Sequence, residues 1–373
     1  MDAIIFLIGL ALIFYILFDA FETVVLPRRV SSRFRLTSAV RRNLWSLWLL
    51  PVRGLPPSHR KEDYLSIFGP LSLLVLFFIW VVALIFGFSL LLLALNSPFN
   101  ATDKAINFGT DLYASGSTFF TAVGIAPRTP AAQALVVGEV GVGFAFLALV
   151  IGYIPAVYQA FAEREVQITL MDARAGSPPT AFELLRRSGQ EDLERGATDA
   201  SDVIKDFLTS GENWTAELLE THLSYPLLAF YRSQHESQSW LAALAAILDA
   251  SALASVGIAG IPRVTGRLSF AMARHCLVDL AQVYRTPPHS SSDQRLTPVD
   301  FEHMRSELEK AGISLDGRGD FYQSLSEQRE LYEPYLASLS SYLVIPIPAW
   351  MPEEERLDNW QSTAWSGSGA VRL

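Results

Sequence analysis

One short stretch between two long apolar segments has the composition to place bare backbone oxygens beside a solvated path. Residues 117–130 read STFFTAVGIAPRTP, and this run is too short to cross a bilayer, which takes about 20 apolar helical residues. Non-helical backbone at membrane depth is tolerated only where it is buried in protein or lines a water-filled cavity. Carbonyl oxygens that face such a cavity can replace the hydration shell of a cation. The stretch therefore predicts a re-entrant pore loop that binds cations through main-chain oxygens.

The same residues also fit an ordinary buried hairpin, in which Gly124 and Pro127 are turn residues. The context favours the pore loop, because apolar spans flank it and a short helix is expected just before it, over Thr110–Phe120. Thr110 and Asp111 lie at the start of that helix, where an N-cap and a negative charge are favourable. The carboxyl end of the helix, which carries partial negative charge, would point toward the cation path.

At this loop the chain resembles the potassium-channel pore-domain family, whose signature runs T-x-x-T-V-G-Y-G-D with a proline shortly after. The resemblance covers roughly Tyr64–Phe161, and Pro130 falls on the later proline. It implies a symmetric homotetramer, because one loop per chain supplies a quarter of a fourfold ring of carbonyls. It also implies permeant monovalent cations, K⁺ foremost, with no cofactor or bound metal. The residues that it places in the filter are Thr121, Ala122, Val123, Gly124, Ile125 and Ala126.

The loop departs from the family signature at four positions. Ala122 stands where the family has the innermost filter hydroxyl, and Ile125 where it has the tyrosine behind the filter. Ala126 replaces the second glycine, and a Cβ in a left-handed conformation costs about 1–2 kcal/mol. Pro127 replaces the acidic residue of the outer mouth. These departures predict a cation pore with weakened potassium selectivity.

Glu139 is the most informative charge of the membrane part. It lies nine residues past Pro130 in an apolar helix, where a carboxylate is costly unless it is paired or hydrated. We expect it behind the filter or near Arg128, where these two residues and Pro127 support the loop. A neutral, protonated Glu139 is the competing account.

The resemblance implies that the third span, Ala131–Phe161, lines the pore and bends at an intracellular gate. It contains several glycines, and Pro155 removes one helical hydrogen bond. Gly141 or Gly143, together with Pro155, is the candidate hinge. The alternative is that the glycines let helices approach closely.

Earlier in the chain, Asp19 and Glu22 lie one helical turn apart near the end of the first span, and we expect the arginines just beyond it to pair with them. Residues 28–61 carry nine basic side chains and no acidic one, which predicts a cytoplasmic loop by the positive-inside rule. Leu44–Leu50 in this loop fits either an interfacial helix or a plain linker, and its basic residues favour anionic lipid head groups.

The two halves of the chain differ in charge. Residues 1–160 carry 11 Lys/Arg and 8 Asp/Glu, whereas residues 161–373 carry 18 and 30, which gives +3 and −12. The acidic half argues against nucleic-acid binding. His235 and Glu236 lack the second histidine of an HExxH metalloprotease helix, and no glycine-rich dinucleotide fingerprint is present. The single cysteine, Cys276, excludes an internal disulfide and is expected to be buried. No catalytic constellation is visible, so an enzyme is not predicted.

The sequence thus predicts an all-α membrane protein with three transmembrane helices, a re-entrant pore loop and a cytoplasmic α-helical domain that controls the gate and binds an unidentified ligand. It is expected in the cell (inner) membrane with its N-terminus outside. The alternative is a non-conducting, membrane-anchored signalling or scaffold protein built on a pore-domain fold. The expected parts are a first transmembrane helix at 1–27, a basic cytoplasmic or interfacial segment at 28–63, a pore domain at 64–161, a cytoplasmic helical domain at 162–349 and a polar tail at 350–373.

Overall fold

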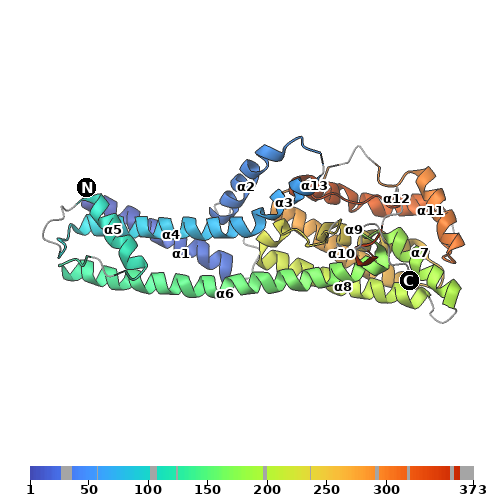
Figure 1. The fold of residues 1–373 in the computed structure, drawn as a ribbon, viewed down its shortest axis with the longest axis horizontal. Coiled ribbons are helices and arrows are strands. Elements are labelled where there is room, and N and C mark those ends of the chain that lie inside the picture. The colour runs from blue at the N-terminus through green and yellow to red at the C-terminus, as the bar shows by residue number, and fades with distance from the viewer. Residues whose placement is uncertain are drawn as a thin grey trace. The chain divides into compact units, whose positions relative to one another are not determined.

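The computed structural model describes residues 1–26, 36–56, 58–100, 107–122, 125–195, 200–235, 237–289, 294–316, 320–352 and 357–361. The secondary structure of these residues is helical, apart from two isolated β-bridges (Figure 1). The chain divides into two compact units, residues 1–159 and 160–373. Four of the described helices are long and apolar enough to cross a membrane. The expectation of an all-α protein with apolar helices of membrane-spanning length is confirmed.

Unit 1 is built on two apolar helices, α1 (Asp2–Val24) and α4 (Phe68–Leu95), which pack along one another. Glycines let them approach closely, because a Cβ added to Gly9 would lie 2.8 Å from the Gly87 carbonyl oxygen. Many outward side chains of α1, such as Phe14, are large and apolar. Large apolar side chains on the outside of a helix are expected where lipid, rather than water, surrounds it.

The carboxyl-terminal end of α1 is held by Asp19, whose carboxylate is buried. It accepts hydrogen bonds from the Trp80 indole at 2.9 Å and from the Thr37 hydroxyl at 2.7 Å. The arginines predicted to pair with it, Arg28 and Arg29, lie outside the described residues. Asp19 therefore connects α1 to α4 and to the helix that follows, without a described arginine.

The basic segment contains α2 (Leu36–Trp48), η1 (Leu50–Val52) and α3 (His59–Ser66). Aromatic contacts connect α2 to the start of α4: the Trp45 and Phe68 ring centroids are 4.6 Å apart, and Trp48 stacks on Tyr64 at 4.6 Å. Most of Leu44–Leu50, expected to be either an interfacial helix or a plain linker, is helical, since α2 ends at Trp48 and η1 begins at Leu50.

The short helix before the loop, α5, spans Phe108–Phe119. It begins two residues earlier than predicted, because Asn107 is the N-cap and accepts a hydrogen bond from the Thr110 amide at 3.0 Å. The next helix, α6, spans Pro130–Ala175 without interruption and includes Pro155. It continues beyond the predicted end at Phe161, and its first part belongs to unit 1 and its last part to unit 2.

Unit 2 surrounds one central helix, α9 (Trp240–Gly257), which is rich in alanine and packs against α8 (Ala200–Ser224) and α10 (Arg263–Tyr284). The apolar window of α9 is 89% buried inside the protein, so α9 is the core helix of this unit. The remaining elements are α7 (Ala181–Arg195), η2 (Pro226–Phe230), α11 (Pro298–Lys310), α12 (Phe321–Glu330), α13 (Glu333–Leu343) and η3 (Asn359–Gln361).

A buried ion pair connects α9 to the segment that leads into α11. The Asp249 carboxylate accepts two hydrogen bonds from Arg295, at 2.6 and 3.2 Å, and one from the Tyr332 hydroxyl at 2.5 Å. The guanidinium groups of Arg295 and Arg329 lie over the ring of Trp350, which is 1% exposed. A buried charge of this kind is tolerated because its hydrogen bonds are satisfied.

The prediction of a polar tail from Trp350 onward is wrong for the residues that the structure describes there. Trp350 belongs to the core of unit 2, and residues 357–361 dock on the same unit. Arg187 forms an ion pair with Asp358 at 2.6 Å, and the Trp360 amide donates to Asp172 at 2.9 Å. Tryptophan side chains that find partners make this segment part of the fold, despite its polar composition.

His222 of α8 is fully buried in unit 2. Its Nδ1 donates to the Leu218 carbonyl at 2.8 Å, and its ring centroid lies 5.1 Å from that of Trp240. Among the described residues, its Nε2 has no hydrogen-bond partner. Burial, together with the positive charge of Arg164, lowers the pKa of His222 to about 3. The folded protein therefore keeps this imidazole neutral.

We predict that His222 makes unit 2 labile to acid. In the unfolded chain the imidazole takes up a proton below about pH 6.5, but the folded protein resists protonation until about pH 3. The free energy of unfolding therefore falls as pH decreases through this range, by up to about 1.4 kcal/mol per pH unit. Denaturant unfolding of the full chain at several pH values, followed for wild type and His222→Gln, measures this effect. A variant with the same acid slope as wild type would contradict it.

Candidate functional site

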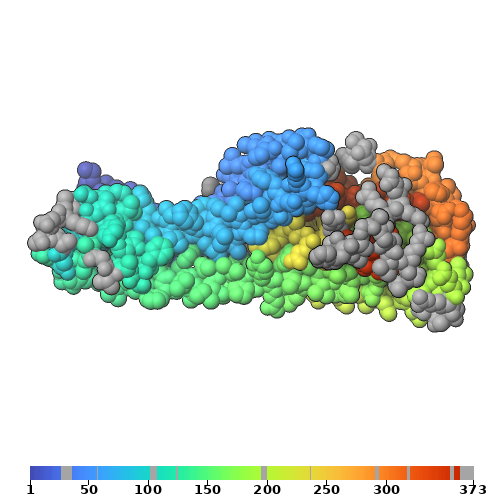
Figure 2. All heavy atoms as spheres, in the orientation of Figure 1, coloured from blue at the N-terminus to red at the C-terminus, as the bar shows by residue number. Residues whose placement is uncertain are grey.

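The candidate site is the region where α5 lies against α4 and α6 (Figures 1 and 2). Ser115 of α5 holds the three helices together: its hydroxyl lies 2.9 Å from the Ile85 carbonyl of α4 and is hydrogen-bonded to Glu139 of α6. Ser115 and Glu139 are both 0% exposed. Glu139 thus contacts the short helix, whereas Arg128 donates to the Asn100 side chain at 3.3 Å.

The carboxyl end of α5 lies deep along α6. A Cβ added to Gly143 would collide with the Phe119 carbonyl oxygen, so the two backbones are in direct contact. Gly143 is 13 residues beyond Pro130, which at the rise of an α-helix is about 20 Å. Ser115 lies closer to the start of α6 than Phe119 does, because its hydrogen-bond partner Glu139 is nine residues beyond Pro130. The carboxyl end of α5 therefore lies well along α6 rather than beside its first residues.

Helix α5 ends in a left-handed cap. Thr121 has a φ of +57°, its amide donates to the Thr118 carbonyl at 2.9 Å, and the Ala122 amide donates to the Ser117 carbonyl at 2.7 Å. This pair of hydrogen bonds is the Schellman arrangement, in which glycine is the usual left-handed residue. A β-branched residue in this conformation is strained, and such strain concentrates at functional sites.

The far end of the loop returns to the level at which α4 ends. Pro127 forms a β-bridge with Phe99, the Asn100 amide donates to the Ala126 carbonyl at 3.0 Å, and the Arg128 amide donates to the Pro98 carbonyl at 2.9 Å. The loop is thus fixed at depth by α5 and near the surface by residues 97–100. Val123 and Gly124, the centre of the predicted filter, lie outside the described residues.

Helix α6 presents three different faces in unit 1. The face toward α5 includes the buried residues Glu139 and Gly143. A second exposed face carries large apolar side chains. On the side away from α5, the exposed residues are small. The large exposed residues are Val137, Phe144, Leu147, Ile151 and Tyr158, and the small ones are Ala134, Gly138, Gly141, Ala145, Ala148 and Gly152.

The two candidate hinge glycines differ in their surroundings. Gly143 is where α5 touches α6, as the close-approach alternative requires, whereas a Cβ added to Gly141 would meet no atom within 4 Å. Pro155 lies inside α6 at an exposed position.

Two buried carboxyl groups lie along α5. Asp111 is in its first turn, and Glu139 of α6 contacts its middle at Ser115, while the carboxyl terminus of a helix itself carries about half a negative charge. Asp111 and Ser115 were not among the predicted site residues. Their spacing of four residues on a short helix between apolar spans is the signal that marks one face of α5.

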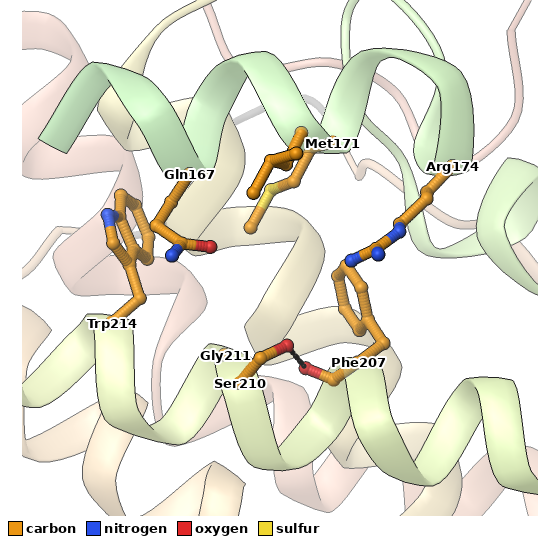
Figure 3. Close-up of a pocket in the computed structure, with 8 residues that line it drawn as sticks. Gln167, Met171, Arg174, Phe207, Ser210, Gly211 and Trp214 are labelled. Atoms are coloured by element: carbon orange, nitrogen blue, oxygen red, sulfur yellow. Dashed lines mark hydrogen bonds between the residues drawn. The ribbon is translucent and has the colours of Figure 1, made fainter. Parts of the chain in front are cut away.

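Unit 2 contains a small pocket between α6 and α8, shown in Figure 3. Its volume is about 10 Å³, enough for about one water molecule. Ser210 donates to the Phe207 carbonyl at 3.1 Å beside it. This pocket is too small for an organic ligand, and no group of three metal-ligating side chains occurs within the part of the chain that the structure describes. The pocket is lined by Gln167, Leu170, Met171, Arg174, Phe207, Ser210, Gly211 and Trp214.

Comparison of the chain with protein-family models, with curated proteins and with solved structures gives no match.

We predict that Gly143→Ala destabilises the protein, because the added methyl group must displace the end of α5. A forced overlap in a packed interior costs about 1–3 kcal/mol. Gly141→Ala is the matched control on the same helix, and it should be neutral or stabilising by up to about 1 kcal/mol, since alanine is the better helix former. Thermal unfolding in detergent compares the two variants, and equal melting temperatures would contradict the contact.

Proposed function

We propose that this chain is one subunit of a tetrameric cation channel, in which residues 121–126 line the ion path. The observation that carries the proposal is the position of α5, whose end lies about 20 Å along α6 and is followed by a return to Phe99 at the outer level. A helix that enters part-way and a chain that returns on the same side form the layout of a pore loop.

The length of the returning segment is compatible with this role. Residues 119–122 belong to the left-handed cap of α5, so the segment available to return runs from Ala122 to Pro127. These two residues are five positions apart, and a chain of that length reaches at most about 17–18 Å, which is close to the roughly 20 Å between the end of α5 and the start of α6. Extended backbone leaves carbonyl groups without partners in its own segment, and permeant cations would satisfy these groups.

The faces of α6 support a fourfold assembly. Small residues away from α5 leave room for a central aqueous path, while the large apolar face suits lipid or a neighbouring subunit. Four copies around one axis would bring four loops together, as a ring of carbonyl ligands requires. The weakened selectivity proposed here rests on Ala122, Ala126 and Pro127.

Control of the gate by unit 2 is part of the proposal, because α6 is continuous between the two units. Within unit 2, the buried Arg164 of α6 donates to the Leu228 carbonyl and to the Tyr231 carbonyl, each at 2.9 Å. A helix held in this way would follow a movement of η2. We therefore propose that a ligand or partner of unit 2 acts on the pore through α6.

Two tryptophan substitutions on α6 test the ion path. We predict that Ala145→Trp, on the small face, abolishes potassium flux into liposomes because four indole rings would fill a narrow path. Leu147→Trp, on the large apolar face, is the matched control and should retain flux. Both positions are exposed in the single chain, so neither variant overfills a core.

The size of the particle in detergent is the accompanying measurement. Four chains for wild type and both variants, with flux lost in Ala145→Trp alone, is the expected result. Equal flux in the two variants would contradict the path. A tetramer of wild type that is electrically silent would instead favour the non-conducting scaffold, and a monomer or dimer would overturn the channel.

A further inference from the structure

The hydroxyl of Ser115 has two hydrogen-bond partners but only one proton to donate. The Ile85 carbonyl, 2.9 Å away, can only accept. Glu139 is the second partner, and an ionised carboxylate can also only accept. A single serine proton cannot satisfy two acceptors, so one of the two contacts requires a proton from the other side.

We propose that Glu139 carries this proton and is a neutral carboxylic acid that positions α5. The chain of hydrogen bonds then runs in one direction: the Glu139 carboxyl donates to the Ser115 hydroxyl, which donates to the Ile85 carbonyl. Three helices are held by one proton on a side chain that is 0% exposed. The effect on conduction rests on the proposed function, whereas the protonated acid rests on these contacts alone.

The surroundings of Glu139 contain no described cation to stabilise a charge. On α5 the nearest ionisable group is Asp111, one turn from Ser115, which is itself buried and acidic. Helix α4 has no ionisable side chain, and Asp19 of α1 is engaged with Trp80 and Thr37. Arg128 pairs with Asn100 in the loop. A buried carboxylate with no described cation beside it disfavours ionisation, because burial removes the water that would stabilise the charge.

Loss of the proton would break the chain of hydrogen bonds at Ser115. The hydroxyl could then donate to the Ile85 carbonyl or to the carboxylate, but not to both, so one of the two hydrogen-bonded links between the helices would be lost. The end of α5 would keep its packing at Gly143 and its ring contact with Phe146, but α5 would no longer be tied to both α4 and α6 by Ser115. We therefore infer that α5, and with it the loop, is positioned only while Glu139 is protonated.

Infrared spectroscopy of the purified full chain tests the protonation directly. The carbonyl band of a protonated carboxyl group should be present at neutral pH and absent in Glu139→Gln. Asp111→Asn is the matched control, because it removes the neighbouring acid and should leave the band in place. Absence of the band in wild type, or its loss in Asp111→Asn alone, would overturn the assignment.

Thermal unfolding tests the positioning role with a conservative variant. The amide of Glu139→Gln can donate to Ser115 as the acid does, so its melting temperature should stay within about 2 °C of wild type, whereas Glu139→Ala should lose at least about 4 °C. The wild-type melting temperature should fall at high pH, and that of Glu139→Gln should not. Equal losses in the two variants would overturn the proton-bearing role.

Flux separates this inference from the proposed function. In liposomes, wild-type potassium flux should fall as pH rises, whereas the flux of Glu139→Gln should not change with pH. If the infrared band is present but neither protein conducts potassium, the protonated acid is supported and the channel is overturned. Flux with the same pH profile in both proteins would overturn the positioning of the loop by Glu139.

Discussion

Unpaired backbone amide and carbonyl groups cannot be left in lipid, and the architecture of unit 1 follows from this constraint. The long helices α1, α4 and α6 satisfy their own groups along their length. Helix α5 is too short to do so across a membrane and therefore needs partners at both ends. Asn107 caps its start, the left-handed turn at Thr121 caps its end, and the Ser115 hydroxyl reaches the Ile85 carbonyl. These contacts give the polar groups at both ends and on the packed side of α5 partners within the protein.

Close backbone approach brings helices of unit 1 together at two crossings. Gly9 meets Gly87 between α1 and α4, and Gly143 meets Phe119 between α6 and α5. Small residues at such crossings are typical of helices that associate in lipid, where no hydrophobic force pulls them together. Gly143 is therefore a packing residue in this structure, whereas Gly141 retains free space around it.

Local patterns in the sequence predicted much of the fold and part of the site. Helix α4 begins and ends where the sequence signals it, because Gly-Pro and Asn-Ser-Pro punctuate the two ends of an unbroken apolar run. The end of α6 was placed too early, since its polar continuation has no stop signal and its packing partners are distant in sequence. Contacts such as Ser115 with Glu139 or Asp249 with Arg295 join residues 24 and 46 positions apart. Residue patterns cannot specify such pairs, because tertiary packing alone brings them together.

Pro155 gives α6 one mechanical weak point. It has no amide proton, so the carbonyl of Ile151 lacks its usual partner one turn earlier. On one side of this gap lies Glu139 with its proton, and on the other lies Arg164 with its two carbonyl acceptors. A helix that is held on both sides of a missing hydrogen bond bends most easily at that point, while its remaining hydrogen bonds still resist twisting. Rotation of α6 about its own axis, more than a change in its tilt, is therefore the movement that would pass across Pro155 from one held segment to the other.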